Sequence, residues 1–166
     1  MGLVGGALGY HLLRWVGGTG DRGWCDGRAY RSQSKVEALF GPTIWRELAT
    51  KVVIDFGCGA GQEAIETAEH GAHCVIGIDN RESVLNDARR AAQHRGVGDR
   101  CHFVAHTDVR VDAILSIDAF EHFGDPAGVL RQMSTLLKPG GRVYVSFGPP
   151  WYHPFGGHLF SVASNG

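Results

Sequence analysis

The residues best suited to hold a small ligand lie in the segment Asp55-Phe-Gly-Cys-Gly-Ala-Gly61. Its glycines recur at every second position, directly after a short apolar run and directly before a helical pattern. Alternating glycines let the backbone pass close to a ligand, and the start of a helix presents free N–H groups to an anionic moiety. A tight strand-to-helix turn alone would need fewer glycines. The segment therefore predicts a ligand-binding loop.

The spacing of these glycines argues against a nicotinamide cofactor. Such sites normally carry G-x-G-x-x-G, and Gln62 occupies the position that would complete this spacing. Asp79 ends the next apolar run, at a place from which a carboxylate can accept both hydroxyls of a ribose in an open α/β sheet. A surface aspartate at a strand end is the alternative reading of Asp79. We expect a nucleoside ligand other than a nicotinamide dinucleotide.

The elements that position this loop alternate between strands and helices. Short apolar runs alternate with amphipathic helical patterns, and the expected strands are 51–56, 73–79, 101–105, 111–117 and 142–147. The first two of these are expected to be buried parallel strands, and the last shows an alternating pattern. Helices are expected over 62–70, over 82–95, and from Asp125-Pro126 to the terminating Pro139-Gly140-Gly141. This alternation predicts a Rossmann-like, doubly wound, mostly parallel α/β sheet with helices on both faces.

A helical cap is expected before the first strand. Ser34 and Glu37 have the spacing of a capping box, so a helix should begin near Ser34. Gly41 and Pro42 interrupt it, and a second helical turn should end near Ala49. We divide the chain into a glycine-rich segment with this cap, residues 1–50, and a ligand-binding core, residues 51–166.

Composition narrows the class of protein. The 166 residues are 43% hydrophobic, which suits a single globular domain. The formal charge of -1, without a basic run, gives no electrostatic footprint for nucleic acid. The cysteines have no C-x-x-C spacing, so they predict neither a zinc site nor a redox dithiol, and reduced thiols suit a cytoplasmic protein. The apolar stretch 1–15 is interrupted by His11 and Arg14 and is too short for a membrane span.

Four segments together resemble successive motifs of class I S-adenosylmethionine-dependent methyltransferases, of the type 11 and type 25 groups. The order and spacing of the motifs match as well, and the resemblance covers about residues 51–150. The segments are Val-Ile-Asp-Phe-Gly-Cys-Gly-Ala-Gly61, Gly-Ile-Asp79, Ile-Leu-Ser-Ile-Asp-Ala-Phe-Glu-His122 and Leu-Leu-Lys-Pro-Gly-Gly-Arg-Val-Tyr-Val145. Four motifs in register on predicted strand ends are far more specific than one glycine loop.

The resemblance implies S-adenosyl-L-methionine as the cofactor and assigns residues to its parts. Asp79 would hold the ribose hydroxyls and Asn80 would lie beside the adenine. Asp108 is the candidate for the adenine amino group, although the connection that contains it is short and Asp108 could equally be a turn residue. Asp118 would face the methionine part or could equally cap a helix. The other residues implied around the methionine and ribose are Asp55, Gly57, Cys58, Gly59, Gly61, Ile117 and Phe120.

Methyl transfer from a sulfonium needs alignment more than acid catalysis, because the leaving group departs neutral. A hydroxyl or phenol acceptor would also need a base, and His122 is the candidate, with a structural role as the alternative. His153 and His158 are weaker candidates, and the aromatic residues Trp151, Tyr152 and Phe155 could line an acceptor pocket. The expected acceptor is a small molecule. The alternatives are a binding module without turnover and, less favoured, a nicotinamide-dependent oxidoreductase.

The sequence after the fifth expected strand predicts an incomplete sheet. Class I methyltransferases usually continue with a helix and two antiparallel strands, whereas the residues after Phe147 are rich in proline and glycine. We expect the sheet to lack its last two strands and the fifth strand to be an edge. An unpaired edge is a template for association, so a homodimer through this strand or poor solubility is expected. We also expect cofactor binding with weak or absent turnover.

Overall fold

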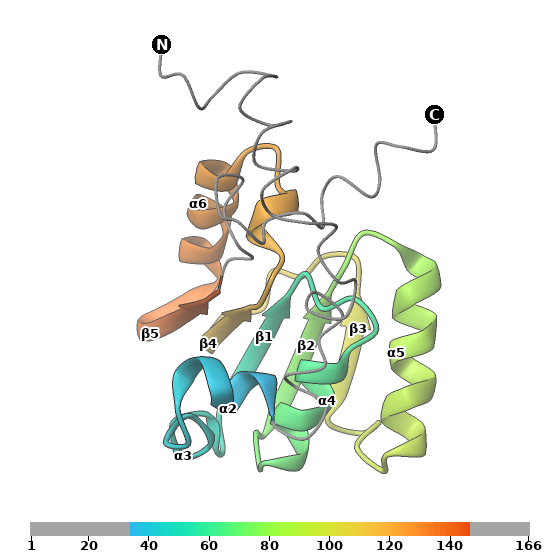
Figure 1. Cartoon of the computed structure of the whole chain (residues 1–166). Helices are drawn as coiled ribbons and strands as arrows, with labels where there is room; N and C mark the ends of the chain where they lie inside the picture. Colours follow the sequence, from blue (N-terminus) through green and yellow to red (C-terminus); the bar gives the residue numbers. More distant parts are fainter. Residues whose placement is uncertain (1–33, 147–166) are drawn as a thin grey trace, which may run out of the picture. The chain divides into compact units, whose positions relative to one another are not determined.

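The computed structural model describes residues 34–146, which fall within one compact unit. Five parallel strands form one sheet in the order β3-β2-β1-β4-β5 (Figure 1). The strands are β1 (Val52–Phe56), β2 (Cys74–Ile78), β3 (Cys101–Val104), β4 (Val111–Ser116) and β5 (Leu137–Val145). The five-strand Rossmann-like sheet expected from the sequence is confirmed. Its strand order reverses between β1 and β4, and open α/β sheets bind ligands beyond the carboxyl ends of their strands at such a point.

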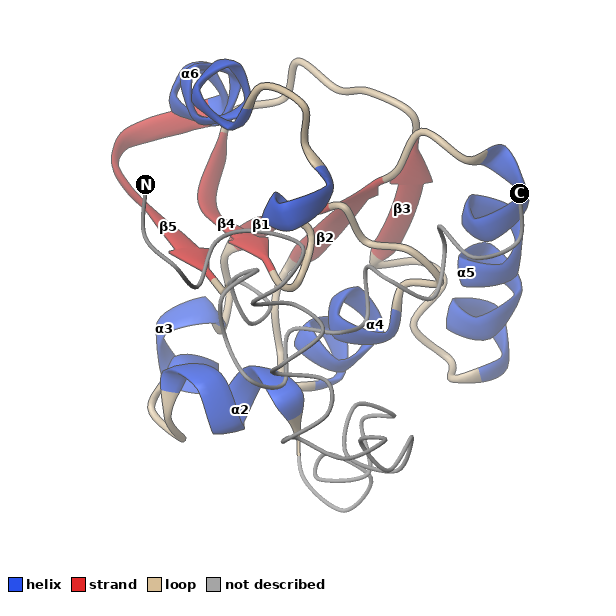
Figure 2. Ribbon diagram, turned by 45° about the horizontal axis from the view of Figure 1, so that its top comes forward, coloured by secondary structure: helices blue, strands red, loops and turns tan. Residues whose placement is uncertain are grey.

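Helices cover both faces of the sheet (Figure 2). One face carries α2 (Lys35–Phe40), α3 (Ile44–Leu48), α4 (Gln62–Glu69) and α5 (Glu82–His94). The other face carries the 3-10 turn η2 (Phe120–His122) and α6 (Pro126–Leu136). Because successive strand residues point to opposite faces, β1 contributes Val53 to the first hydrophobic core and Ile54 to the second.

The predicted helix starts coincide with side-chain caps. The hydroxyl of Ser34 accepts a hydrogen bond from the Glu37 backbone N–H at 3.0 Å, and α2 begins at the next residue. The Asp125 carboxylate accepts from the Gly128 N–H at 2.9 Å, with Pro126 in the first turn of α6. Such caps satisfy N–H groups that have no partner within a helix. Both predicted starts are therefore confirmed.

The fifth strand begins earlier than expected. It starts at Leu137, directly after α6, whereas the sequence predicted a terminator at Pro139 and a strand from residue 142. The register with β4 shifts between its first and next paired positions, so the segment 138–141 forms an irregularity in the strand. A bulge accommodates proline, which lacks an N–H, and Gly140, whose φ is 79°.

The sequence analysis did not predict the 3-10 turn η2. No helix among the described residues is long and apolar enough to cross a membrane.

Candidate functional site

Three aspartates gather where the strand order reverses. Asp55 lies in β1, Asp79 directly follows β2, and Asp118 lies just beyond β4. The parallel pairing of β1 with β2 and with β4 places the carboxyl ends of these strands at one edge of the sheet. The ends of these strands therefore bring Asp55, Asp79 and Asp118 to one edge of the sheet.

The glycine loop between β1 and α4 has a left-handed backbone at three positions. The φ angles are 84° at Gly57, 50° at Gly59 and 79° at Gly61. An added Cβ would lie 2.6 Å from the Ala119 side chain at Gly57 and 2.6 Å from the Phe103 ring at Gly61, but it would meet nothing within 4 Å at Gly59. Gly57 and Gly61 are thus required for packing, whereas Gly59 leaves open space beside the loop.

Asp55 is a buried carboxylate whose hydrogen bonding is incomplete. Its residue exposure is 2%, and Oδ2 has no hydrogen-bond partner among residues 34–146. Burial first, and then the nearby charge of Glu63, raises the pKa of Asp55 well above its ordinary value, while a backbone hydrogen bond from Ala64 and the charge of Lys35 act in the opposite direction. A buried polar atom without a partner is costly. Oδ2 is therefore suited to receive a donor or a cation from a ligand.

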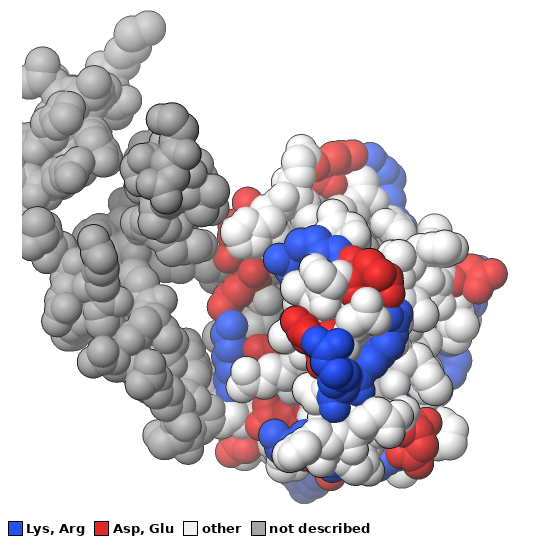
Figure 3. Space-filling model, turned by 90° about the vertical axis from the view of Figure 1, so that its right-hand side faces the viewer, with Lys and Arg blue, Asp and Glu red and all other residues white. Residues whose placement is uncertain are grey.

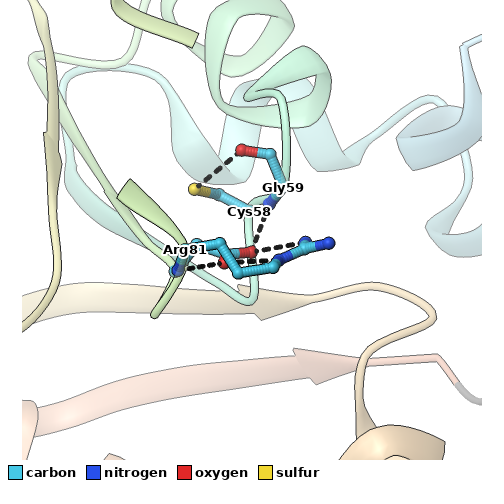
Figure 4. Close-up of polar contacts among 4 residues, drawn as sticks. Cys58, Gly59 and Arg81 are labelled. Carbon is cyan, nitrogen blue, oxygen red and sulfur yellow. Dashed lines mark hydrogen bonds and ion pairs between the residues drawn. The ribbon is translucent and has the colours of Figure 1, made fainter. Parts of the chain in front are cut away.

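Asp79 is held by the loop and by Arg81 (Figure 4). Oδ2 accepts from the Gly59 N–H at 3.1 Å, and Oδ1 accepts from the Arg81 N–H at 2.9 Å. The Arg81 guanidinium adds one bond to each oxygen, both at 3.0 Å. Burial raises the pKa of Asp79, but the bonds from Arg81 and Gly59 together bring it below its ordinary value. Asp79 is therefore an ionised acceptor at neutral pH.

Asp118 joins three elements at the same edge. Its φ is 48°, and its Oδ2 lies 2.6 Å from the ammonium of Lys35 in α2. The Ser146 hydroxyl, just past β5, accepts from the Asp118 N–H at 3.2 Å and donates to Oδ1 at 3.1 Å. Non-glycine residues rarely adopt positive φ, and they do so where surrounding contacts enforce it. The sequence analysis missed Lys35 and Ser146; a hydroxyl residue at the end of the expected fifth strand was the available signal for Ser146.

The other predicted site residues differ in accessibility. Cys58, Ile117 and Phe120 are buried, and the Cys58 thiol donates to the Gly59 carbonyl at 3.6 Å. Burial, followed by the charge of Asp55, raises the pKa of the Cys58 thiol far above its usual range. Exposed positions are Asn80 after β2, Asp108 in the connection from β3 to β4, and His122 at the end of η2. The candidates Trp151, Tyr152, His153, Phe155 and His158 lie outside the described residues.

Comparisons with known proteins identify the family of this chain. The chain matches a family model described as a methyltransferase domain over residues 48–148. Ubiquinone biosynthesis O-methyltransferase of Aeromonas salmonicida is 37% identical over 102 residues, which are 58% of this chain and 42% of the relative. The tRNA 5-carboxymethoxyuridine methyltransferase of Escherichia coli K12 is 36% identical over 126 residues, 71% of this chain and 46% of the relative. The chain thus spans less than half the length of these two relatives.

Solved structures give the same family. A methyltransferase from Thiobacillus denitrificans, named as S-adenosylmethionine-dependent and solved with S-adenosylhomocysteine, has a TM-score of 0.54 at 26% identity, covering 62% of this chain and 45% of its own. The [4+2]-cyclase SpnF has a TM-score of 0.55 at 26% identity, covering 61% of this chain and 42% of its own. The family-model match extends over more than half of the chain, and this chain therefore belongs to the methyltransferase domain family and has the Rossmann-like fold of S-adenosylmethionine-dependent methyltransferases.

Proposed function

We propose that this chain binds S-adenosyl-L-methionine at the glycine loop and transfers its methyl group to a small-molecule acceptor. The observation that carries the proposal is the arrangement around Gly59. A Cβ added at Gly59 would meet no atom within 4 Å, and the Gly59 N–H donates to the ionised carboxylate of Asp79. The buried, partnerless Oδ2 of Asp55 belongs to β1, the strand that leads into this loop. A ribose with an attached amino acid requires three features of its site. These are space beside the backbone of the loop, a group that can pair with a cation, and an acceptor for the hydroxyl donors.

The residues present fit the parts of this cofactor. Asp79 would accept the ribose hydroxyls, and Oδ2 of Asp55 would receive a donor from the amino-acid part. Asn80 and Asp108, both exposed beyond β2 and β3, would contact the adenine. Gly57, Gly61, Cys58, Ile117, Asp118 and Phe120 would complete the surroundings of the methionine and ribose. When bound, the cofactor supplies an electrophilic methyl group on a sulfonium.

The chain's own contribution to transfer would be alignment and, for some acceptors, proton removal. Fixing the reacting groups in line accounts for much of the barrier reduction in such a displacement. His122 is exposed at the end of η2, four residues beyond Asp118 in the sequence. An imidazole there is suited to take a proton from a hydroxyl or phenol near neutral pH.

A small-molecule acceptor is favoured by the charge of the chain. The formal charge is -1, and on the face that carries α5 acidic and basic side chains lie interspersed (Figure 3). The arginines there are paired, Arg89 with Glu82 and Arg95 with Glu69, each at 2.6 Å. Paired charges give no uniform positive field for a phosphate backbone. The relatives named above act in ubiquinone biosynthesis and on a tRNA nucleoside, so both acceptor classes belong in the test.

A binding module without methyl transfer is the second candidate. The fold is shared with a protein named as a [4+2]-cyclase, so the fold alone does not establish methyl transfer. A nicotinamide-dependent oxidoreductase is disfavoured because Gln62 replaces the last glycine of that fingerprint.

We also propose a cytoplasmic location, which is supported by the free cysteines of the described region, Cys58, Cys74 and Cys101. We further propose self-association through the edge strand β5.

Thermal unfolding with added ligands tests the proposal. S-adenosylmethionine and S-adenosylhomocysteine should raise the Tm while NAD should not, because only ligands that bind the folded state stabilise it. The variant Asp79→Ala should lose most of the shift. Transfer of a labelled methyl group to quinol-type phenols, compared with transfer to tRNA, then assigns the acceptor class. Stabilisation without transfer to any acceptor would favour the binding module, and stabilisation by NAD alone would overturn the proposal.

A further inference from the structure

The carboxylate of Asp79 is fully occupied by donors from the chain itself. Oδ1 receives the Arg81 backbone N–H and the Arg81 Nε, and Oδ2 receives the Gly59 N–H and the Arg81 Nη2. An ionised carboxylate has about four lone-pair positions for hydrogen bonds. The four donors therefore leave no position for a fifth.

Two of these donors are fixed and two are removable. The Gly59 N–H belongs to the glycine loop, and the Arg81 N–H belongs to the N-cap residue of α5. The guanidinium, in contrast, sits on a side chain that is 63% exposed, whereas the Asp79 side chain is 7% exposed. An exposed long side chain can turn into water without leaving a cavity. Only the guanidinium can vacate the carboxylate while the loop stays intact.

We propose that the Arg81 guanidinium competes with the cofactor ribose for Asp79 and thereby sets the cofactor affinity of the site. The inference rests on the proposed function, in which Asp79 accepts two ribose hydroxyls. The guanidinium places one donor on each carboxylate oxygen, Nε on Oδ1 and Nη2 on Oδ2 (Figure 4). Two neighbouring hydroxyls also offer one donor to each oxygen. Arg81 therefore occupies the two positions that the ribose needs, and each bound cofactor must displace it.

The size of the effect follows from the exposure of the arginine. A bidentate arginine–carboxylate pair is stronger than a neutral hydrogen bond, but solvent screening leaves an exposed pair with a modest net contribution. Removing the competitor should tighten cofactor binding by about fivefold. This increase in cofactor affinity should be smaller in 1 M salt, where the electrostatic screening length falls to about 3 Å.

The experiment titrates S-adenosylhomocysteine calorimetrically into four proteins of full chain length. Arg81→Gln removes the guanidinium and should bind about fivefold more tightly than the unchanged protein. Arg81→Lys keeps the charge without the paired donors and should show a smaller gain. Arg90→Gln is the matched control, since Arg90 is an exposed arginine of α5 paired with Asp87, away from Asp79, and its affinity should be unchanged.

A pair of ligands tests whether the gain comes from the ribose hydroxyls. With Arg81→Gln, binding of adenosine should tighten, whereas binding of 2′,3′-dideoxyadenosine, which lacks both hydroxyls, should not. Equal gains for both ligands would overturn the inference, because the arginine would then act on something other than the ribose.

The variant Asp79→Asn separates this inference from the proposed function. If Asp79→Asn weakens binding but Arg81→Gln binds equally or more weakly than the unchanged protein, the ribose role of Asp79 stands and the competition is wrong. If Asp79→Asn leaves the Kd unchanged, the ribose lies elsewhere, and both the proposed role of Asp79 and the competition fail. Weakening by Asp79→Asn together with tightening by Arg81→Gln supports both.

Discussion

The ammonium of Lys35 lies 2.6 Å from Oδ2 of Asp118 and 3.9 Å from Oε1 of Glu63, so helix α2 contributes a charge to the edge of the sheet that carries the candidate site. Lys35 also acts against the raised pKa of the buried Asp55. The family match begins only at residue 48. This cation thus belongs to a part of the chain that precedes the matched domain, and it lies close to the negative charges of Asp118 and Glu63.

The first prediction concerns the effect of this charge on ligand preference. S-adenosylmethionine carries one more positive charge than S-adenosylhomocysteine. Because Lys35→Met removes a positive charge from this edge of the sheet, it should increase the affinity for S-adenosylmethionine relative to that for S-adenosylhomocysteine. The ratio of the two Kd values should change by about threefold or more, since charges near a protein surface interact over several ångströms. Calorimetric titration with both ligands measures this ratio, in which effects common to both ligands cancel.

Lys138→Met provides the matched control for Lys35. Lys138 pairs with Asp112 at 3.0 Å near the start of β4, away from the carboxyl ends of the strands. Its removal should leave the ratio of the two Kd values unchanged. An unchanged ratio for Lys35→Met as well would show that the sulfonium lies beyond the reach of this cation.

The second prediction separates the roles of the loop glycines. Gly59→Ala should cost about 1 kcal/mol of stability through its positive φ, because its Cβ meets no atom. Gly61→Ala should cost about 2–4 kcal/mol, since its Cβ would also lie 2.6 Å from Phe103. Gly59→Val should abolish cofactor binding in a folded protein. Urea unfolding and calorimetric titration measure both properties, and normal cofactor binding by Gly59→Val would contradict the proposed site.

The third prediction follows from the raised pKa of Asp55. Its carboxyl keeps a proton at pH values above its ordinary pKa, and a cation beside Oδ2 would favour the ionised form. Binding of S-adenosylmethionine should therefore release a proton. The affinity should rise as pH increases toward the raised pKa, by at most about tenfold per pH unit. Titration in two buffers of different ionisation enthalpy measures the proton release directly.

Two controls isolate Asp55 as the source of that proton. Adenosine lacks the amino-acid part and should bind without the pH dependence. Asp55→Asn keeps an acceptor for the Ala64 N–H but cannot ionise, so it should lose the dependence. In the free protein a raised carboxyl pKa lowers stability as pH increases above the unfolded value, and Asp55→Asn should also remove this decline. Equal pH dependence for adenosine would assign the proton to another group.

The strands and most helices could be predicted from the sequence because their signals are local. β-Branched runs marked β1 and β2, and Ser34 and Asp125 marked helix starts by the caps that they form. The early start of β5 could not be predicted, because Pro139 normally ends an element and only pairing with β4 keeps this segment in the sheet. The long-range pairing of this segment with β4 therefore outweighed the local signal of Pro139 for the end of an element.

The site shows the same division between local and long-range information. The glycine loop and Asp79 were predicted because their residue types and spacing are local. Lys35, Arg81 and Ser146 were missed, since their roles depend on contacts made after folding. Arg81 is near Asp79 in sequence, yet nothing in the sequence indicates that its guanidinium turns back onto the carboxylate. Asp108 and His122 remain predictions, because exposure alone does not assign a role to either residue.

The fourth prediction concerns self-association through β5. Within residues 34–146 this strand pairs with β4 alone, so its other edge presents unpaired backbone groups. Val143, two residues before the end of β5, is 37% exposed. We expect light scattering to show a mass that increases with concentration toward that of a dimer. Val143→Lys should shift the association to higher concentration, because a charge on an edge strand opposes pairing with a second strand.

Leu130→Lys distinguishes strand pairing from general apolar adhesion. Leu130 lies in α6 and is 49% exposed, so it presents more of its side chain than Val143 but no strand edge. If the dimer forms by addition of strands, Val143→Lys should weaken it and Leu130→Lys should leave it unchanged. Equal weakening by both variants would indicate a broad apolar contact instead. A monomer at every concentration would show that the edge of β5 is protected, and hydrogen exchange at the Val143 and Val145 amides would then be slow, because a covered edge holds its N–H groups in hydrogen bonds.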